Sequence, residues 1–229
     1  MLTRWQQYFE DSYAGTHSIL EAAVEHWQFY TPVYHRMKTL LRPGSSILDI
    51  GSGYGFSDIY LSACGYDVTG VEYDQGVLQN SLAVAQQFKS AVRFEEGTAF
   101  DLSRYYNKFD LAYSVGVLEH FDRDVTVRLV AEKAKCAPLV MTMIPTRFIK
   151  YSAGLTDERI YSPGEFAGIV RDAGLDVLGI FAYGDVPGMM PRLARGVLPY
   201  GVWRWIRDGW GIGMGLGCIG RRRADRLSK

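Results

Sequence analysis

The stretch Ile47-Leu48-Asp49-Ile50-Gly51-Ser52-Gly53-Tyr54-Gly55 decides the fold of this chain. Residues 46–50 are mostly apolar and predict a short buried strand, and residues 56–64 predict a helix. Between them, glycines at every second position let the backbone turn sharply and approach a ligand where a Cβ atom would clash. The helix that follows offers free backbone N–H groups at its start. The stretch therefore predicts a strand, a ligand-binding loop and a helix.

Short apolar runs and helical patterns alternate on the C-terminal side of this loop. We expect strands at 46–50, 66–72, 92–95, 109–114, 139–144, 175–183 and 211–219, and helices at 56–64, 75–88 and 124–135. A further helix should begin at the capping box Ser162-Pro163-Gly164-Glu165 and end at Gly174. Such alternation predicts an α/β fold, with a doubly wound, mostly parallel seven-stranded sheet and helices on both faces.

The two ends of the chain depart from this alternation. Residues 1–43 carry one apolar stripe at helical spacing, which Thr31-Pro32 interrupts, so we expect two helices that meet there. Residues 184–210 are expected to form an irregular insertion, and 211–229 a last strand and a basic tail. We interpret residues 1–229 as a single domain, with its core at 44–183.

Composition excludes several classes of protein. The 25 basic and 25 acidic side chains balance, so nothing indicates nucleic-acid binding. Cys64, Cys136 and Cys218 form no CxxC pair, which excludes the usual zinc and redox motifs and suits a reducing compartment. The N-terminus has no apolar signal core, and no apolar run is long enough to span a bilayer. We therefore expect a soluble, cytoplasmic protein.

Two acids flank the predicted loop. Asp49 precedes the glycines, where it would repel a phosphate, so it is better suited to fix the loop or to meet a cationic amino group. Glu72 ends the second predicted strand, at about the distance where an acid meets ribose hydroxyls in such folds. The G-x-G-x-G spacing, with Phe56 in place of a last glycine, differs from the G-x-G-x-x-G of dinucleotide enzymes.

Residues 47–55, 71–74, 97–101 and 109–120 together resemble the class I methyltransferases that use S-adenosylmethionine (SAM), in the subgroup with ubiquinone-type and small-molecule enzymes. The resemblance covers about residues 40–183 and implies a Rossmann-like fold with an N-terminal helical lid at 1–43. Thr98 stands where the family usually has an acid that bonds the adenine amino group. The resemblance implies that SAM, and the product S-adenosylhomocysteine (SAH), contact the following residues: Asp49, Gly51, Ser52, Gly53, Gly55, Glu72, Tyr73, Thr98, Ala99, Phe100, Ser114 and Val115.

The catalytic residues we expect are His120 and Glu119, which follow the fourth predicted strand. Histidine can accept a proton near neutral pH, and each side chain could equally have a structural role. Some ubiquinone-type relatives bind a metal through an acid three positions before that glutamate, but Gly116 stands there, so no metal is expected. The reaction would be methyl transfer to O, N or C of a small molecule that the sequence does not identify.

The N-terminal region holds further candidates. His17, His26 and His35 could face the acceptor but are more often solvated, and the rings of Tyr8 and Tyr13 could shield the positive sulfur of SAM or simply pack.

The segment 189–210 combines apolar and aromatic residues with arginines. It is compatible with a lipid-like acceptor, a membrane surface, a lid, a homodimer contact or a packed hairpin. Two alternative functions also stay open. One is an NAD-dependent oxidoreductase, which the glycine spacing disfavours. The other is a non-catalytic methyltransferase-like partner protein, which the loss of the acid at Thr98 allows.

Overall fold

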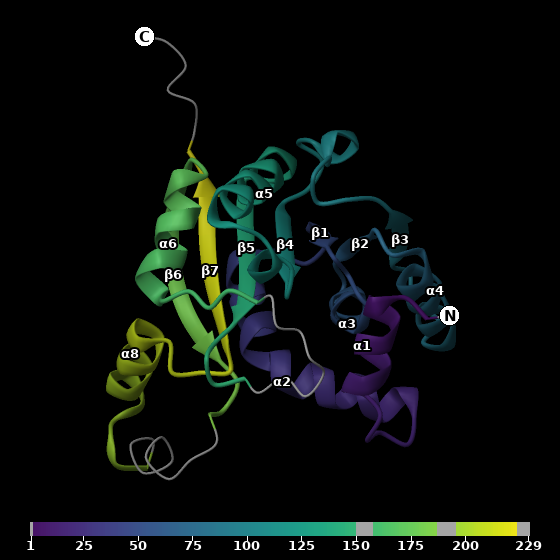
Figure 1. The fold of residues 1–229 in the computed structure, drawn as a ribbon, viewed down its shortest axis with the longest axis horizontal. Coiled ribbons are helices and arrows are strands. Elements are labelled where there is room, and N and C mark those ends of the chain that lie inside the picture. The colour runs from purple at the N-terminus through teal and green to yellow at the C-terminus, as the bar shows by residue number, and fades with distance from the viewer. Residues whose placement is uncertain (1, 150–157, 187–195, 224–229) are drawn as a thin grey trace.

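The computed structural model describes residues 2–149, 158–186 and 196–223. A seven-stranded sheet forms its centre (Figure 1). The strands are β1 (Ser46–Ile50), β2 (Asp67–Glu72), β3 (Arg93–Glu96), β4 (Leu111–Val115), β5 (Leu139–Pro145), β6 (Leu175–Tyr183) and β7 (Gly215–Arg222). The helices are α1 (Arg4–Ser12), α2 (Ile19–Leu40), α3 (Phe56–Ala63), α4 (Gln75–Gln87), α5 (Arg123–Cys136), α6 (Pro163–Asp172) and α8 (Tyr200–Trp210), with 3-10 turns at Ser103–Tyr105 and Leu118–His120.

The strand order is β3-β2-β1-β4-β5-β7-β6. Neighbouring strands are parallel except β7, which runs antiparallel to both β5 and β6. From β1 the chain moves outward to β2 and β3, and it then returns to place β4 on the other side of β1. Open α/β sheets bind ligands where the strand order reverses in this way, beyond the carboxyl ends of the strands. The predicted mostly parallel, doubly wound sheet of seven strands is confirmed.

Helices cover both faces of the sheet. On one face Tyr34 and Met37 of α2 pack with Ile47 and Tyr113. On the other face α5 and α6 bury a second apolar cluster against β5 and β7, which includes Val130, Phe166, Ile169, Val140 and Leu216. Successive strand residues point to opposite faces, so β1 supplies Ile47 to one cluster and Leu48 to another.

Helix caps follow the predicted chemistry. Ser162 and Glu165 form the capping box of α6, and Gly174 takes a left-handed conformation just past the end of that helix. Asp74 caps α4 by accepting from the backbone N–H groups of Gly76 and Val77.

The prediction that Thr31-Pro32 separates two helices is wrong. The break lies at residues 13–18, and α2 runs through Pro32 without ending. The proline leaves the carbonyl of Gln28 without its usual helical donor, and the Thr31 hydroxyl donates to the Trp27 carbonyl 2.8 Å away. Buried residues on both sides of Pro32 keep the helix whole, because packing on α3 and the sheet outweighs the local preference.

The expectation of an irregular insertion at 184–210 also needs correction. Residues 200–210 form α8, while 187–195 lie outside the described residues. The last strand begins at Gly215, later than the predicted 211, because Gly211 takes a left-handed conformation that ends α8. No helix in the described ranges is both long and apolar enough to cross a membrane.

We expect Pro32→Ala to stabilise the protein by about 1–2 kcal/mol, since alanine restores the helical N–H and proline is about 3 kcal/mol less favourable than alanine inside a helix. Part of that gain is lost because proline also restricts the unfolded chain. Urea denaturation of both proteins would measure the change. A variant less stable than the wild type would show that the ring itself packs in a way alanine cannot replace.

Candidate active site

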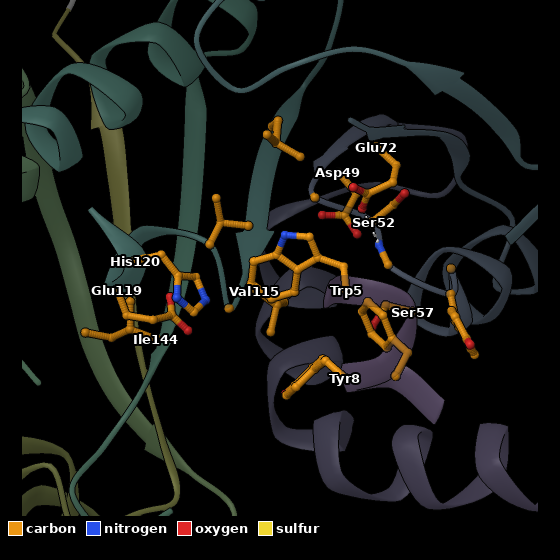
Figure 2. A pocket seen from close by; sticks show the side chains of 18 of the residues that line it. Trp5, Tyr8, Asp49, Ser52, Ser57, Glu72, Val115, Glu119, His120 and Ile144 are labelled. Atoms are coloured by element: carbon orange, nitrogen blue, oxygen red, sulfur yellow. Dashed lines mark hydrogen bonds between the residues drawn. The ribbon is translucent and has the colours of Figure 1, made fainter. Parts of the chain in front are cut away.

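A cavity of about 740 Å³ opens beyond the carboxyl ends of β1, β2 and β4. Its walls come from the glycine loop, the tip of β2, residues 97–100, residues 115–121, and helices α1 and α2. Figure 2 shows Asp49, Ser52 and Glu72 gathered at one end and Glu119 and His120 at the other, with the Trp5 ring between. The pocket thus has two chemically distinct ends, which we call the loop end and the acid–histidine end.

The loop needs glycine at positions 51, 53 and 55. Gly51, Gly53 and Gly55 all have positive φ, between 56° and 77°. A Cβ atom on Gly53 would lie 2.5 Å from Cζ of Phe9, and one on Gly55 would lie 2.2 Å from Cζ of Phe94. The glycine backbone of the loop therefore contacts α1 and the pocket without intervening side chains, as the spacing predicts.

Glu72 sits at the tip of β2 and faces this loop. Its carboxylate accepts from the backbone N–H groups of Gly53 (3.1 Å), Tyr73 (2.9 Å) and Asp74 (3.0 Å). Burial raises the pKa of Glu72, and these three donors oppose that rise. The acid thus holds the loop and also lines the pocket.

Asp49 lies under the loop in a buried group of polar side chains. Its Oδ1 has no hydrogen-bond partner among the described residues. Burial raises the pKa of Asp49 to about 7 and also raises that of its neighbour Asp58. The Tyr113 hydroxyl donates to Asp58 at 2.9 Å. A buried carboxyl group that lines the pocket, with one oxygen lacking a partner, is suited to meet a cation from a ligand.

The remaining predicted cofactor residues divide into two groups. Tyr73, Thr98, Ala99 and Phe100 line the rim of the pocket, with Tyr73 and Phe100 each 59% exposed. The Thr98 hydroxyl accepts from the Phe100 N–H at 3.3 Å. These rings are open to solvent and available to a flat ligand.

Ser52 and Val115 also line the pocket, but Ser114 does not. Alternation along β4 turns Ser114 to the opposite side, where its hydroxyl accepts from Lys133 at 2.6 Å. We therefore remove Ser114 from the candidate site. Burial lowers the pKa of Lys133 to about 7, against the opposing influence of Asp49 and Glu119.

Helix α1 covers the pocket with aromatic rings. Tyr8 and Tyr13, for which the sequence left shielding of the sulfur or simple packing open, line it, and so do Trp5 and Phe9, which were not predicted. The spacing of Trp5, Tyr8 and Phe9 is that of one helix face, so the signal was present. The Trp5 indole N–H donates to the Tyr73 hydroxyl and joins this helix to the pocket rim.

The histidines of the N-terminal helices take no direct part, except that His26 lines the pocket. His26 is held between the Tyr13 hydroxyl at 3.1 Å and the Ser57 hydroxyl at 2.9 Å, and burial lowers its pKa to about 3. A neutral imidazole ring that is held by two hydrogen bonds has a structural role. His17 and His35 are exposed outside the pocket.

The acid–histidine end is formed by the turn after β4. The Glu119 side chain is 1% exposed, its Oε2 has no hydrogen-bond partner among the described residues, and burial raises its pKa to about 8. The His120 ring packs edge-on against Trp5, with 5.1 Å between centroids. Both residues line the pocket, and Glu158 lies close enough to raise the pKa of Glu119 further.

Gly116 occupies the position where some relatives place a metal-binding acid. A Cβ atom there would lie 3.6 Å from Oε1 of Glu119, so the carboxyl packs against bare backbone. Within the described ranges, no group of three His, Cys, Asp or Glu side chains could hold a metal ion.

Known proteins resemble this chain in sequence and in fold. Residues 47–137 match the family model for a methyltransferase domain. A phosphoethanolamine N-methyltransferase of Triticum aestivum is 29% identical over 149 residues, which make up 64% of this chain and 27% of that protein. The chain spans about a quarter of the length of the curated relatives it matches.

Solved structures share the fold at low identity. Magnesium protoporphyrin IX methyltransferase from Synechocystis PCC 6803, solved with bound SAH, is 16% identical with a TM-score of 0.65, over 96% of this chain and 93% of that chain. A chain from the complex of the Haloferax volcanii Trm112 methyltransferase activator with a methyltransferase is 16% identical with a TM-score of 0.64, over 89% and 94% of the two chains. Residues 47–137 are thus similar to a methyltransferase domain, and the described fold is shared with solved structures of methyltransferases.

Proposed function

We propose that this chain binds SAM at the loop end of the pocket and transfers its methyl group to the nitrogen of a small amine at the acid–histidine end. The observation that carries the proposal is the placement of carboxyl groups at both ends of one cavity, with aromatic rings between them. A ligand with positive charge and a flat ring system suits this lining.

The loop end supports SAM through four features. The bare glycine backbone admits a nucleoside closely. Glu72 can accept from ribose hydroxyls, since a carboxylate has about four acceptor positions and three donors occupy it here. Asp49 can meet the ammonium group of the cofactor, and the exposed rings of Tyr73 and Phe100 can flank adenine.

The acid–histidine end supports an amine acceptor. Glu119 and Glu158 both act electrostatically on Tyr8, so two acids and an aromatic ring lie close together. An acceptor with a carboxylate or phosphate next to its reacting atom would be repelled there, whereas an ammonium group is attracted by acids and ring faces. The name of the wheat relative, a phosphoethanolamine N-methyltransferase, is consistent with nitrogen as the acceptor.

The chemistry requires one proton acceptor. Bound SAM would supply a methyl group on a positively charged sulfur. An ammonium acceptor has no lone pair, so it must first lose a proton, which the Glu119 carboxylate or the His120 ring in the pocket lining would accept. The freed lone pair of the nitrogen would then form the N–C bond, and the sulfur would keep the electron pair of the broken S–C bond.

Titration with SAM and SAH tests the loop end. We expect Glu72→Ala to weaken binding about 10- to 100-fold, since a hydrogen bond to a charged group contributes roughly 1.5–3 kcal/mol. Gly53→Arg should abolish binding, because its side chain would meet Phe9. Isothermal calorimetry would measure both, with Glu96→Ala, a strand-end acid on neighbouring β3, as the matched control.

A second titration distinguishes a direct contact between Glu72 and the ribose from the support that Glu72 gives to the loop. The wild type should bind the 2′-deoxy analogue of SAH more weakly than SAH itself, and Glu72→Ala should not distinguish the two. Equal discrimination by both proteins would refute the ribose assignment. Binding of NAD in place of SAM would favour the oxidoreductase alternative.

The pH dependence of activity tests whether Glu119 accepts the proton. If its carboxylate accepts the proton, kcat/KM should rise as the pH passes the pKa of about 8 and the group ionises. Glu119→Gln should lower activity by about 100-fold or more and remove that rise. SAH release would be followed with a panel of primary and secondary amines, alcohols and carboxylic acids as acceptors.

The Glu96→Gln variant should keep the wild-type pH profile. Turnover confined to alcohols or carboxylic acids would refute the amine, and an unchanged profile in Glu119→Gln would transfer the proton-accepting role to His120.

A further inference from the structure

Helix α8 presents its charged side to the fold. Asp208 accepts from the Ala182 backbone N–H on β6 at 3.1 Å and pairs with Arg36 of α2 at 3.3 Å. Arg207 pairs with the same carboxylate at 3.0 Å. Trp203 is the buried apolar residue of this helix. Polar contacts therefore contribute much of the attachment of α8 to β6 and α2.

The apolar side of the same helix points to solvent. Trp205 is 76% exposed and Trp210 is 72% exposed, and Val202 and Tyr200 are exposed with them. At 100° per residue, Val202, Trp205 and Trp210 fall on one side of the helix, roughly opposite Arg204 and Arg207. The apolar side of a helix in a globular protein normally faces the core. The exposed apolar side of α8 therefore indicates an apolar partner outside the fold.

The charge of the surrounding segment is positive. Between Asp185 and Asp208 the sequence contains four arginines, at 192, 195, 204 and 207, and no aspartate, glutamate or lysine. In the structure Asp208 pairs with both Arg36 and Arg207, and Arg204 lies on the same helix, so among the described residues these three arginines have one acid partner between them and positive charge is in surplus. A partner for this region should therefore be anionic.

The size of the face favours a lipid surface over a protein. Eleven residues make a helix about 16 Å long, and a face about 10 Å wide offers much less than the roughly 800 Å² per partner that a stable protein interface buries. Interfacial helices need no matching surface, and they place tryptophan and tyrosine at the headgroup level with arginines on the polar side.

Helix α8 lies in the chain between two strands that reach the pocket. It lies between the end of β6, where Tyr183 lines the cavity, and the start of β7, near Met214, which lines it as well. Figure 1 shows α8 at the outer end of the sheet, beside the edge strand β6.

We infer that α8 is an interfacial anchor, which inserts Trp205 and Trp210 among the headgroups of an anionic bilayer. The inference does not depend on the identity of the methyl acceptor or on binding of SAM. It assigns the outward apolar face of α8 and the arginines of that helix, Arg204 and Arg207, to one partner.

Co-sedimentation of the full chain with vesicles tests this anchor. Vesicles of phosphatidylcholine with one third phosphatidylglycerol should retain the wild type, and vesicles of phosphatidylcholine alone should retain much less. The double variant W205A/W210A should lower the partition coefficient about 10-fold or more, since each buried apolar side chain contributes to partitioning. The double variant L20A/L82A removes exposed apolar residues of α2 and α4 and should bind as the wild type does.

Thermal midpoints would establish that both double variants remain folded, which their exposure leads us to expect. Tryptophan emission should shift to shorter wavelength with anionic vesicles and lose that shift in W205A/W210A. Equal retention of W205A/W210A and wild type, or no retention of either, would overturn the anchor. So would a concentration-dependent dimer in light scattering that W205A/W210A abolishes, because the face would then bind a second copy of the chain.

Discussion

The hydrogen bond from the Gly53 N–H to the Glu72 carboxylate joins the two elements on which the pocket depends. The three glycines of the loop have no side chains to fix their conformation, and all three lie at positive φ. A carboxylate that accepts three backbone N–H groups is a strong constraint, because each charge-assisted bond is about twice as strong as a neutral one. The tip of β2 therefore holds the loop that follows β1.

The same loop determines where α1 can lie. Phe9 packs so closely on Gly53 that a Cβ atom there would overlap its ring, and Phe9 also stacks on Tyr54 with 4.8 Å between centroids. A larger residue at position 53 would push α1 off the pocket as well as strain the backbone. Glycine at position 53 therefore allows both the left-handed backbone of the loop and the close packing of Phe9 of α1 on that loop.

The glycine spacing and the two acids predicted the loop end of the site because backbone geometry there is local. Gly51, Gly53 and Gly55 lie within one turn, and Glu72 follows from the length of a single βα unit. Lys133 and Asp58 could not be predicted, since each looks like an ordinary helix residue and is buried only by elements distant in sequence. The same limit explains Ser114, whose side of β4 depends on where the strand begins.

Periodicity predicts that a helix has two sides, but it does not show which side faces the fold. For α2 the apolar stripe faces the sheet, and packing on both sides of Pro32 kept a helix that local preference would have divided. For α8 the stripe faces outward, because Asp208 satisfies the Ala182 N–H at the end of β6 and meets Arg36. A backbone donor near the end of an edge strand, and a cation on a neighbouring helix, determined the orientation of α8. Both lie outside residues 189–210, so the periodicity of that segment alone does not show that its tryptophans are exposed.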